Sequence, residues 1–340
     1  MNATLDDSKI IIYLSNIGLY AMRYVLIIMI ILGLVGNIFN ILVFHQPKLR
    51  SNPCSFYLIT SAYVNIVWIM ASPLSRMLAT FQLDLSESIS ILCKIRRSVA
   101  YSFSSLSMIS IAFATVDRFL ISSPQVEYRR LSSLRNAHRL IIITAFIYCL
   151  IFADMFYCLD IVGVPPSITC TINTTRMCGL YNEIARLIVL VFIPSMLILI
   201  FGYGTIRNVK KSRRISRPQG NTIHRIDRHL TQMVIGQIVL IMISYIPNTI
   251  QRIYLVLTLD LEKSPLRLRI EIFSGEVTFI MTTFQSSLSF YIYATIGGTL
   301  FRQTLKRLLR HMFNKKYSVK RQRYKTKFQT SSCAFLPSDE

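Results

Sequence analysis

The chain has 340 residues, of which 52% are apolar and only 16% are charged, and this composition excludes a disordered or collagen-like protein. Soluble domains usually carry about 25% charged residues, so an ordinary soluble domain is also disfavoured. The formal charge of +22 would suit a nucleic-acid partner, but no basic face with interleaved aromatic residues accompanies it, and we expect no nucleic acid.

Seven apolar blocks explain the composition. Each is about 20 residues or longer, which is the length that a helix needs to cross ~30 Å of hydrocarbon. In chain order the blocks are Tyr24–Phe44, Phe56–Leu74, Ser98–Ile121, Leu140–Leu159, Ile184–Tyr203, Met233–Leu257 and Phe273–Ile296. The sequence therefore predicts an all-α membrane protein, a bundle of seven transmembrane helices without a second soluble domain.

The basic residues indicate the orientation of this bundle. They concentrate between blocks three and four, between blocks five and six, and after block seven. Positive charge is retained on the cytoplasmic side of a membrane, so we expect a multi-pass plasma-membrane protein with an extracellular N-terminus. The two glycosylation sequons, at Asn2 and Asn173, both fall on the predicted outer side.

The parts outside the blocks complete the predicted organisation. Residues 1–20 are expected to form the extracellular N-terminus and residues 21–298 the seven-helix domain. Residues 299–312 place apolar side chains on one face and basic ones on the other, which predicts an amphipathic helix on the inner membrane surface. Residues 313–340 are expected to form a disordered cytoplasmic tail.

Three cysteines lie on the predicted outer side, where the compartment is oxidising. Cys93 precedes block three, and Cys170 and Cys178 precede block five, so a disulfide among them is expected. Cys158, at the end of block four, is expected to be a free thiol. No Cys or His spacing is typical of a metal site, and neither a metal nor a cofactor is predicted.

Polar residues recur inside the blocks, where an unpaired polar group is costly. Asn37 follows Gly36 in the first block, Asn65 lies in the second and Ser107 in the third. Asp154 is expected deep in the fourth block, as a structural residue or a ligand contact. These positions predict hydrogen bonds between helices.

The third block has the most informative spacing. Arg118 follows Cys93 by 25 residues, which corresponds to about 37 Å along a helix. One helix therefore places the cysteine at the outer surface and the pair Asp117-Arg118 at the inner surface. In the sixth block, Pro247 predicts a bend just after Tyr245, and Asp227 lies twenty residues before the proline.

These motifs resemble those of the rhodopsin-like (class A) G-protein-coupled receptors. Asp117-Arg118-Phe119 is similar to their Asp-Arg-Tyr motif, and Ser244–Pro247 is similar to Cys-Trp-X-Pro. Ser289–Tyr293 stands where the family has Asn-Pro-X-X-Tyr, and of that motif only Tyr293 is retained. Such departures are similar to those of divergent invertebrate neuropeptide (FMRFamide-like) receptors.

The resemblance implies roles for individual residues. Arg118 would receive the C-terminal helix of a heterotrimeric G protein, and Asp227 would pair with Arg118 in the resting receptor. Asn65 replaces the family's acidic sodium ligand, so little sodium modulation is expected. Cys170 precedes Pro194 by 24 residues, which suits a loop that reaches back over block three. The disulfide Cys93–Cys170 is therefore favoured over Cys93–Cys178.

The expected ligand follows from the outer ends of the helices. Ala100 stands where amine receptors have an aspartate, which argues against a biogenic amine. Mixed charge suits a short peptide better than a lipid, and the expected pocket residues are Arg97, Ala100, Tyr245, Arg252 and Glu276.

The expected partners are the ligand, a G protein, arrestin and the bilayer. A non-signalling decoy receptor and a receptor for a non-peptide ligand remain alternatives, with a transporter more remote. No cluster of catalytic or metal-binding residues favours an enzyme.

Overall fold

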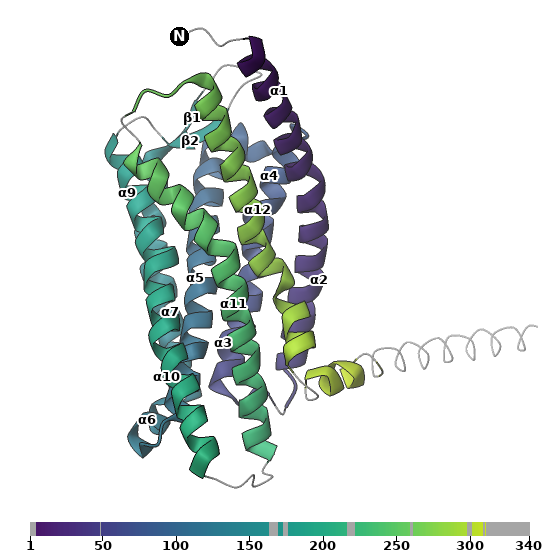
Figure 1. Cartoon of the computed structure of the whole chain (residues 1–340), viewed down its shortest axis with the longest axis vertical. Helices are drawn as coiled ribbons and strands as arrows, with labels where there is room; N and C mark the ends of the chain where they lie inside the picture. The colour runs from purple at the N-terminus through teal and green to yellow at the C-terminus, as the bar shows by residue number, and fades with distance from the viewer. Residues whose placement is uncertain are drawn as a thin grey trace, which may run out of the picture.

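The computed structural model describes residues 5–47, 49–162, 169–172, 176–215, 222–258, 261–297, 301–308 and 310. These residues form seven helical spans that run side by side, with a small hairpin at one end of the bundle (Figure 1). We call the end that carries the hairpin the outer end and the opposite end the inner end. The predicted seven-helix bundle is confirmed.

The spans are built from the following elements. Span one joins α1 (Leu5–Tyr20), a π-helical segment (Ala21–Val25) and α2 (Leu26–Phe44), and span two joins α3 (Pro53–Ala71) and α4 (Pro73–Ala79). Span three is α5 (Ser90–Ser122), and span four contains α7 (Leu134–Ile151), a 3₁₀ turn (Phe152–Asp154) and α8 (Met155–Cys158). Span five contains α9 (Arg176–Arg186), a π-helical segment (Leu187–Phe192) and α10 (Ile193–Ile215), while spans six and seven are α11 (Thr222–Leu257) and α12 (Pro265–Ile296).

Shorter elements connect the spans. A 3₁₀ turn (Leu85–Glu87) lies before α5 at the outer end, and α6 (Val126–Leu131) lies after α5 at the inner end. Strands β1 (Leu159–Val162) and β2 (Thr169–Ile172) form an antiparallel hairpin in which Leu159 pairs with Ile172 and Val162 with Thr169. The hairpin was not anticipated, because its strands are only four residues long.

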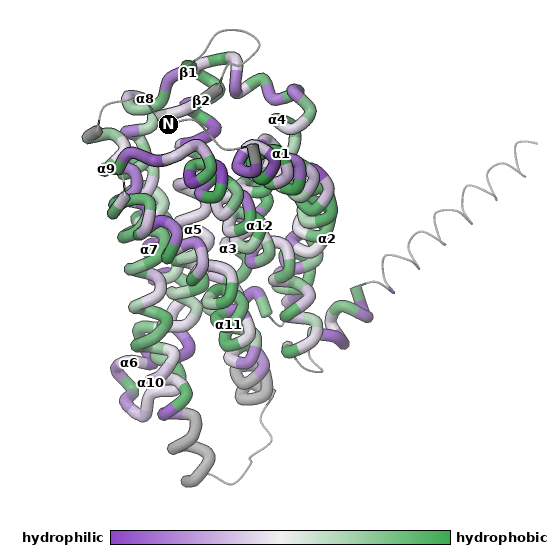
Figure 2. Tube along the Cα trace, turned by 45° about the horizontal axis from the view of Figure 1, so that its top comes forward, coloured by the Kyte–Doolittle hydropathy of each residue, from purple (hydrophilic) through white to green (hydrophobic). Residues whose placement is uncertain are grey.

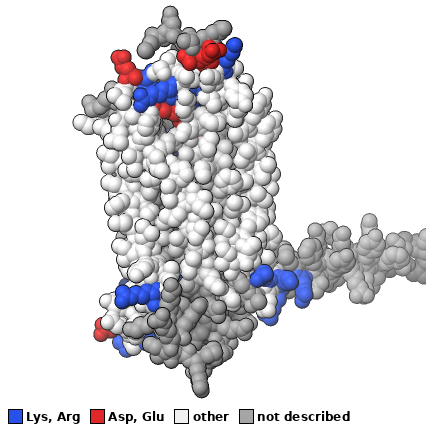
Figure 3. Space-filling view, in the orientation of Figure 1, with Lys and Arg blue, Asp and Glu red and all other residues white. Residues whose placement is uncertain are grey.

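The surface has the pattern of a membrane protein. Charged side chains gather in two bands, at the outer and inner ends, and the face between them is uncharged in the view of Figure 3. The trace is mainly hydrophobic along the spans and hydrophilic toward the ends (Figure 2). Ile142, Phe146 and Leu150 on α7 and Ile200 on α10 are exposed, as expected for side chains that face lipid.

Within the described residues, six helical runs are long and apolar enough to cross a membrane, and α12 is not among them. The reason is a set of polar side chains that α12 buries inside the bundle. This set consists of Thr278, Thr282, Thr283, Gln285, Ser286, Ser287 and Ser289. The seventh span therefore has a lower hydropathy because it contributes the polar residues of the interior.

The third span is at the centre of the bundle. In the apolar 18-residue stretch of α5, 72% of the residues are buried, against 17% for the span Leu134–Cys158. Helices α3, α7, α10 and α11 all contact α5. A helix in this position touches both the outer cavity and the inner end, so it can connect them.

The ends of the spans differ from the sequence expectation. Within the described residues, the first helix begins at Leu5 and continues through the π-helical segment to Phe44, so it covers many residues before the predicted block at Tyr24. Residues 301–308 are helical, within the amphipathic helix predicted at 299–312. The predicted tail, residues 313–340, lies outside the described residues.

Candidate functional site

A cavity opens among the helices near the outer end. Its lining comes from spans two, three, five, six and seven. Trp68 and Phe279 supply aromatic surface, and Tyr245 lies on α11 two residues before Pro247. The cavity has a volume of about 80 Å³, which is small for a ligand site.

A break in the second span positions one side of this cavity. Ser72 has a non-helical backbone (φ −121°, ψ −67°), and Pro73 starts α4 directly after it. Proline lacks an N–H and is favoured at the first position of a helix. The new helix carries Arg76, whose guanidinium lies 4.2 Å from the centroid of the Phe279 ring. Arg76 lines the cavity, although it was not among the expected pocket residues.

The structure brings most of the predicted pocket residues together. Arg97, Ala100, Tyr245 and Arg252 all line the cavity. Glu276 was expected with them but does not line it. Its carboxylate pairs with Arg269 at 3.3 Å, and both side chains lie against Gly18 of α1. On the long helix α12, Glu276 points toward the first span, which the sequence expectation did not take into account.

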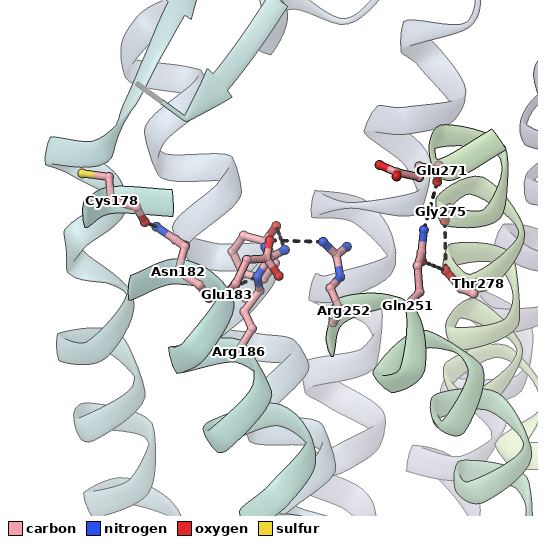
Figure 4. Close-up of polar contacts among 10 residues, drawn as sticks. Cys178, Asn182, Glu183, Arg186, Gln251, Arg252, Glu271, Gly275 and Thr278 are labelled. Atoms are coloured by element: carbon pink, nitrogen blue, oxygen red, sulfur yellow. Dashed lines mark hydrogen bonds and ion pairs between the residues drawn. The ribbon is translucent and has the colours of Figure 1, made fainter. Parts of the chain in front are cut away.

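A network of charged residues joins the fifth and sixth spans at the outer end (Figure 4). Glu183 accepts a hydrogen bond from Arg186 on its own helix and another from Arg252 of α11 at 3.2 Å. Arg186 also donates to the Tyr101 hydroxyl at 2.8 Å. The single carboxylate of Glu183 therefore holds two arginines of the cavity wall.

The outer end of α11 is also tied to α12. Gln251 donates to the backbone carbonyl of Glu271 at 3.1 Å, and its side-chain oxygen accepts from Thr278 at 2.5 Å (Figure 4). Gln251 and Arg252 are adjacent on α11. Gln251 binds the sixth span to the seventh, and Arg252 binds it to the fifth. Both contacts lie within five residues of Pro247, so a change at either one would act on the part of α11 next to the proline.

Two disulfides fix the segment that carries the hairpin. Cys93 at the start of α5 is bonded to Cys170 in β2, in agreement with the favoured pairing. Cys178 is bonded to Cys158, so the prediction of a free thiol at Cys158 is wrong. The second bond closes only 20 residues, because the fourth span ends close to the start of the fifth.

Asp154 lies beside this second disulfide. Its carboxylate accepts a hydrogen bond from Asn182 at 2.9 Å. Asp154 was expected deep in the fourth block, but it lies only four residues before Cys158, where the fourth span ends at the outer side. Ser133 caps the start of this helix by accepting from the Asn136 N–H at 3.3 Å.

The first outer loop is fastened by carboxylates. Asp84 accepts hydrogen bonds from Ser75 and from the Ser86 N–H at 3.0 Å, and Arg96 lies 4.0 Å away. Burial alone would raise the pKa of Asp84, but the hydrogen bonds from Ser75 and Ser86, together with Arg96, outweigh it and lower that pKa. Glu87 pairs with Arg96 at 3.0 Å and accepts from the Cys170 N–H at 2.6 Å.

A neutral polar core lies in the middle of the bundle. Ser107 donates to the Asn65 side-chain oxygen at 2.6 Å, and Asn65 donates to Asn37 at 3.4 Å. Asn37 itself donates to the Ser286 carbonyl at 2.9 Å. Gly36 permits this contact, because a Cβ there would lie 3.0 Å from that of Phe290. The structure thus joins Asn37, Asn65 and Ser107 in one network between four spans.

At the inner end, the third span buries an ion pair. Arg118 is 2% exposed and pairs with Asp117 at 2.6 Å. It also donates to the Asn52 side chain at 2.9 Å, while Asp117 accepts from Ser132. Asn52 caps α3 by accepting from the Cys54 N–H at 3.0 Å. The side chain of Asp227 lies outside the described residues, as do Asn2 and Asn173.

Tyr293 lies at the inner end of α12. Its ring is 2% exposed and packs edge-on against Phe44, with the centroids 5.8 Å apart. Phe301 is also buried and packs against both rings. The helix at 301–308 is therefore anchored to the first and seventh spans by an aromatic cluster.

The comparisons with known proteins place this geometry in a family. A family model described as "7 transmembrane receptor (rhodopsin family)" matches residues 36–293, which is more than half of the chain. The match runs from Gly36 to Tyr293, and so it includes the outer cavity, the polar core and the inner ion pair. No curated protein matches the chain.

Proposed function

The chain belongs to the rhodopsin family of seven-transmembrane receptors, and from this premise we propose that its ligand is a short extracellular peptide. Members of this family are receptors, not enzymes; they bind an extracellular ligand and signal through a heterotrimeric G protein. The proposal places the receptor in the plasma membrane, with its N-terminus outside and glycosylated at Asn2 and Asn173. Arrestin is proposed as a further partner.

The observation that carries the proposal is the mixed charge at the outer end of the bundle. Glu183–Arg252, Lys263–Glu271 and Arg269–Glu276 are ion pairs at the outer end. A peptide presents charged and polar groups along its backbone and side chains, and it can exchange them for these pairs. A lipid ligand would offer few groups that could replace the partners in these pairs.

Binding is proposed to act through the sixth span. The ligand would change the contacts of Gln251 and Arg252, and the bend at Pro247 would let the inner half of α11 swing outward. Arg118 would then leave Asp117 and Asn52, and the proposed bridge from Arg118 to Asp227 would open, so that Arg118 can receive the G protein. Tyr245 and Tyr293 would serve as switches above and below the polar core.

The test is a G-protein dissociation assay in cells, run against a library of neuropeptides. A peptide response is expected, and Arg118→Ala is expected to abolish it at equal surface expression. Arg139→Ala provides the matched control, because Arg139 is an exposed arginine on α7 near the inner end and its loss should leave the response intact. A response that survives Arg118→Ala would contradict the proposed coupling site.

One observation favours a second candidate, a non-signalling decoy receptor. Ser289 and Phe290 stand where the family has Asn-Pro, and Ser289 accepts a hydrogen bond from Asn40 at 3.2 Å. A continuous helix at this position lacks the proline bend that a switch can use. A receptor that binds a peptide at the cell surface but dissociates no G protein would favour this alternative.

A further inference from the structure

The outer cavity has a one-sided charge. Its lining includes five arginines: Arg76, Arg96, Arg97, Arg186 and Arg252. None of the lining residues is an aspartate or a glutamate. Behind the wall, Asp84 and Glu87 flank Arg96, and Glu183 is shared by Arg186 and Arg252. Three carboxylates therefore form ion pairs with three of the arginines, and the other two arginines form none among the described residues.

Arg76 and Arg97 are those two. No carboxylate of the described residues lies within ion-pair distance of either side chain. Arg97 donates to the Cys170 carbonyl at 3.3 Å, while its Nε is buried and has no hydrogen-bond partner in the described part of the chain. Arg76 rests on the Phe279 ring and lies within electrostatic range of Arg97 and Arg252.

Such an arrangement is unfavourable without an anion. Arginine stays charged, and like charges repel more strongly at the low dielectric constant of a protein interior than in water. An oxyanion that accepts from two guanidinium groups would satisfy their donors and relieve the repulsion. The cavity is about 80 Å³, which suits a group of a few atoms rather than a whole ligand.

We propose that this cavity binds a single anionic group, a carboxylate or a similarly small oxyanion, at the end of the receptor's ligand, with Arg76 and Arg97 as its partners. The inference rests on the proposed receptor function and specifies the chemistry of its ligand. Trp68, Phe279 and Leu190 line the same cavity, so the group next to the anion is apolar or aromatic. A peptide with a free C-terminal carboxylate after an aromatic residue has both features, and an amidated peptide lacks the charge.

A matched pair of probes tests the charge on the purified receptor. N-acetylphenylalanine and its amide differ in charge but hardly in shape, and at about 0.3 kcal/mol per heavy atom a ligand of this size binds with a Kd on the order of 1 mM. At ten times that concentration, the acid is expected to raise the unfolding midpoint by about 2–4 °C. The amide is expected to leave it unchanged. Equal shifts with the two probes would overturn the proposal.

Substitutions assign the effect to the two arginines. Arg76→Gln and Arg97→Gln are each expected to weaken binding of the acid by about tenfold or more, as for loss of a charge-assisted hydrogen bond. Lys94→Gln removes the same charge from the outer end of α5, outside the cavity lining, and is expected to have no effect. If the Arg97→Gln variant does not fold, Arg97→Lys, which keeps the charge, replaces it in the experiment. The Arg97→Lys receptor should still bind the acid more tightly than the amide.

The design separates this inference from the proposed coupling. Binding is read on the receptor alone, so a silent G-protein assay would contradict coupling and leave the anion site standing. Conversely, a peptide that acts with unchanged potency on folded Arg76→Gln and Arg97→Gln receptors would overturn the anion site and leave coupling intact. Free phosphate in place of the acid distinguishes a site for any oxyanion from one that requires the adjacent apolar group.

Discussion

Asn65 contributes a neutral amide where the family usually has a carboxylate. Its oxygen accepts from Ser107 at 2.6 Å and its nitrogen donates to Asn37 at 3.4 Å. The amide is thus satisfied by side chains of the first and third spans. A cation at this position would have to break these bonds without gaining a negative charge.

Sodium is therefore expected to have no effect on ligand affinity. The measurement is peptide binding to membranes in sodium chloride and in potassium chloride at the same ionic strength. Asn65→Asp restores a carboxylate and is expected to introduce a sodium effect, which makes it a positive control. A large sodium effect on the unmodified receptor that disappears in Asn65→Ala would contradict this reading.

At the scale of elements, most of the helices could be predicted, because a membrane span requires a continuous apolar run. The ends of the spans were harder to predict. The first helix extends to Leu5 and the fourth begins at Leu134, since segments outside the apolar region continue a helix without an apolar signature. Hairpin β1–β2 and the bond Cys158–Cys178 depend on how close two spans come, which the sequence does not specify.

Four residues of the cavity were predicted and Arg76 was missed, for a related reason. Arg97, Ala100, Tyr245 and Arg252 were found from their distance to motifs on regular helices. Arg76 was missed because it follows the break at Ser72 and Pro73, which turns the second span toward the cavity. The Ser-Pro pair inside an apolar block was the available signal.

The two disulfides are expected to differ in how much they stabilise the folded state. In the loop-closure description, a loop of 77 residues gives about 4.5 kcal/mol of stabilisation and one of 20 residues about 3 kcal/mol. Replacing Cys93 and Cys170 together by serine should therefore lower the unfolding midpoint more than replacing Cys158 and Cys178 together. Scanning unfolding of the purified variants measures this, and Cys149→Ser, an exposed free cysteine, is the control. The reverse order would contradict the assignment.

The loop around Asp84 is expected to weaken in acid. Because the folded-state pKa of Asp84 is lowered, its contribution to stability is complete above the unfolded value of about 4 and is lost as the pH falls through the folded value. Asp84→Asn should lower the unfolding midpoint at pH 7, with the difference shrinking below about pH 4. Asp160→Asn, an exposed acid of β1, should change little at either pH. A difference that grows in acid would contradict the argument.

At the scale of the whole molecule, charge is divided between the two ends (Figure 3). The outer end pairs acids with bases, as in Glu183–Arg252 and Lys263–Glu271. The inner end adds exposed basic residues, Arg302 and Arg307, on the helix at 301–308. The molecule thus presents a mixed surface on one side of the bilayer and a positive one on the other.

Anionic lipid is expected to stabilise the receptor through this inner surface. A basic residue near an anionic membrane gains about 1 kcal/mol, and salt screens the effect. In nanodiscs, phosphatidylserine should raise the unfolding midpoint relative to phosphatidylcholine, and high salt should remove the gain. Replacing Lys306 and Arg307 together by glutamine should reduce it, while Lys9→Gln on α1 should not. An equal gain in the double variant would contradict this role for the inner helix.

The neutral core has a consequence for the response to membrane voltage. Moving one elementary charge through the membrane field is worth about 2.3 kcal/mol per 100 mV, so a charged group that shifts during activation couples a protein to voltage. The network of Asn37, Asn65 and Ser107 carries no formal charge, so its rearrangement moves no formal charge through the membrane field. A change in membrane potential therefore has no formal charge to act on in this core.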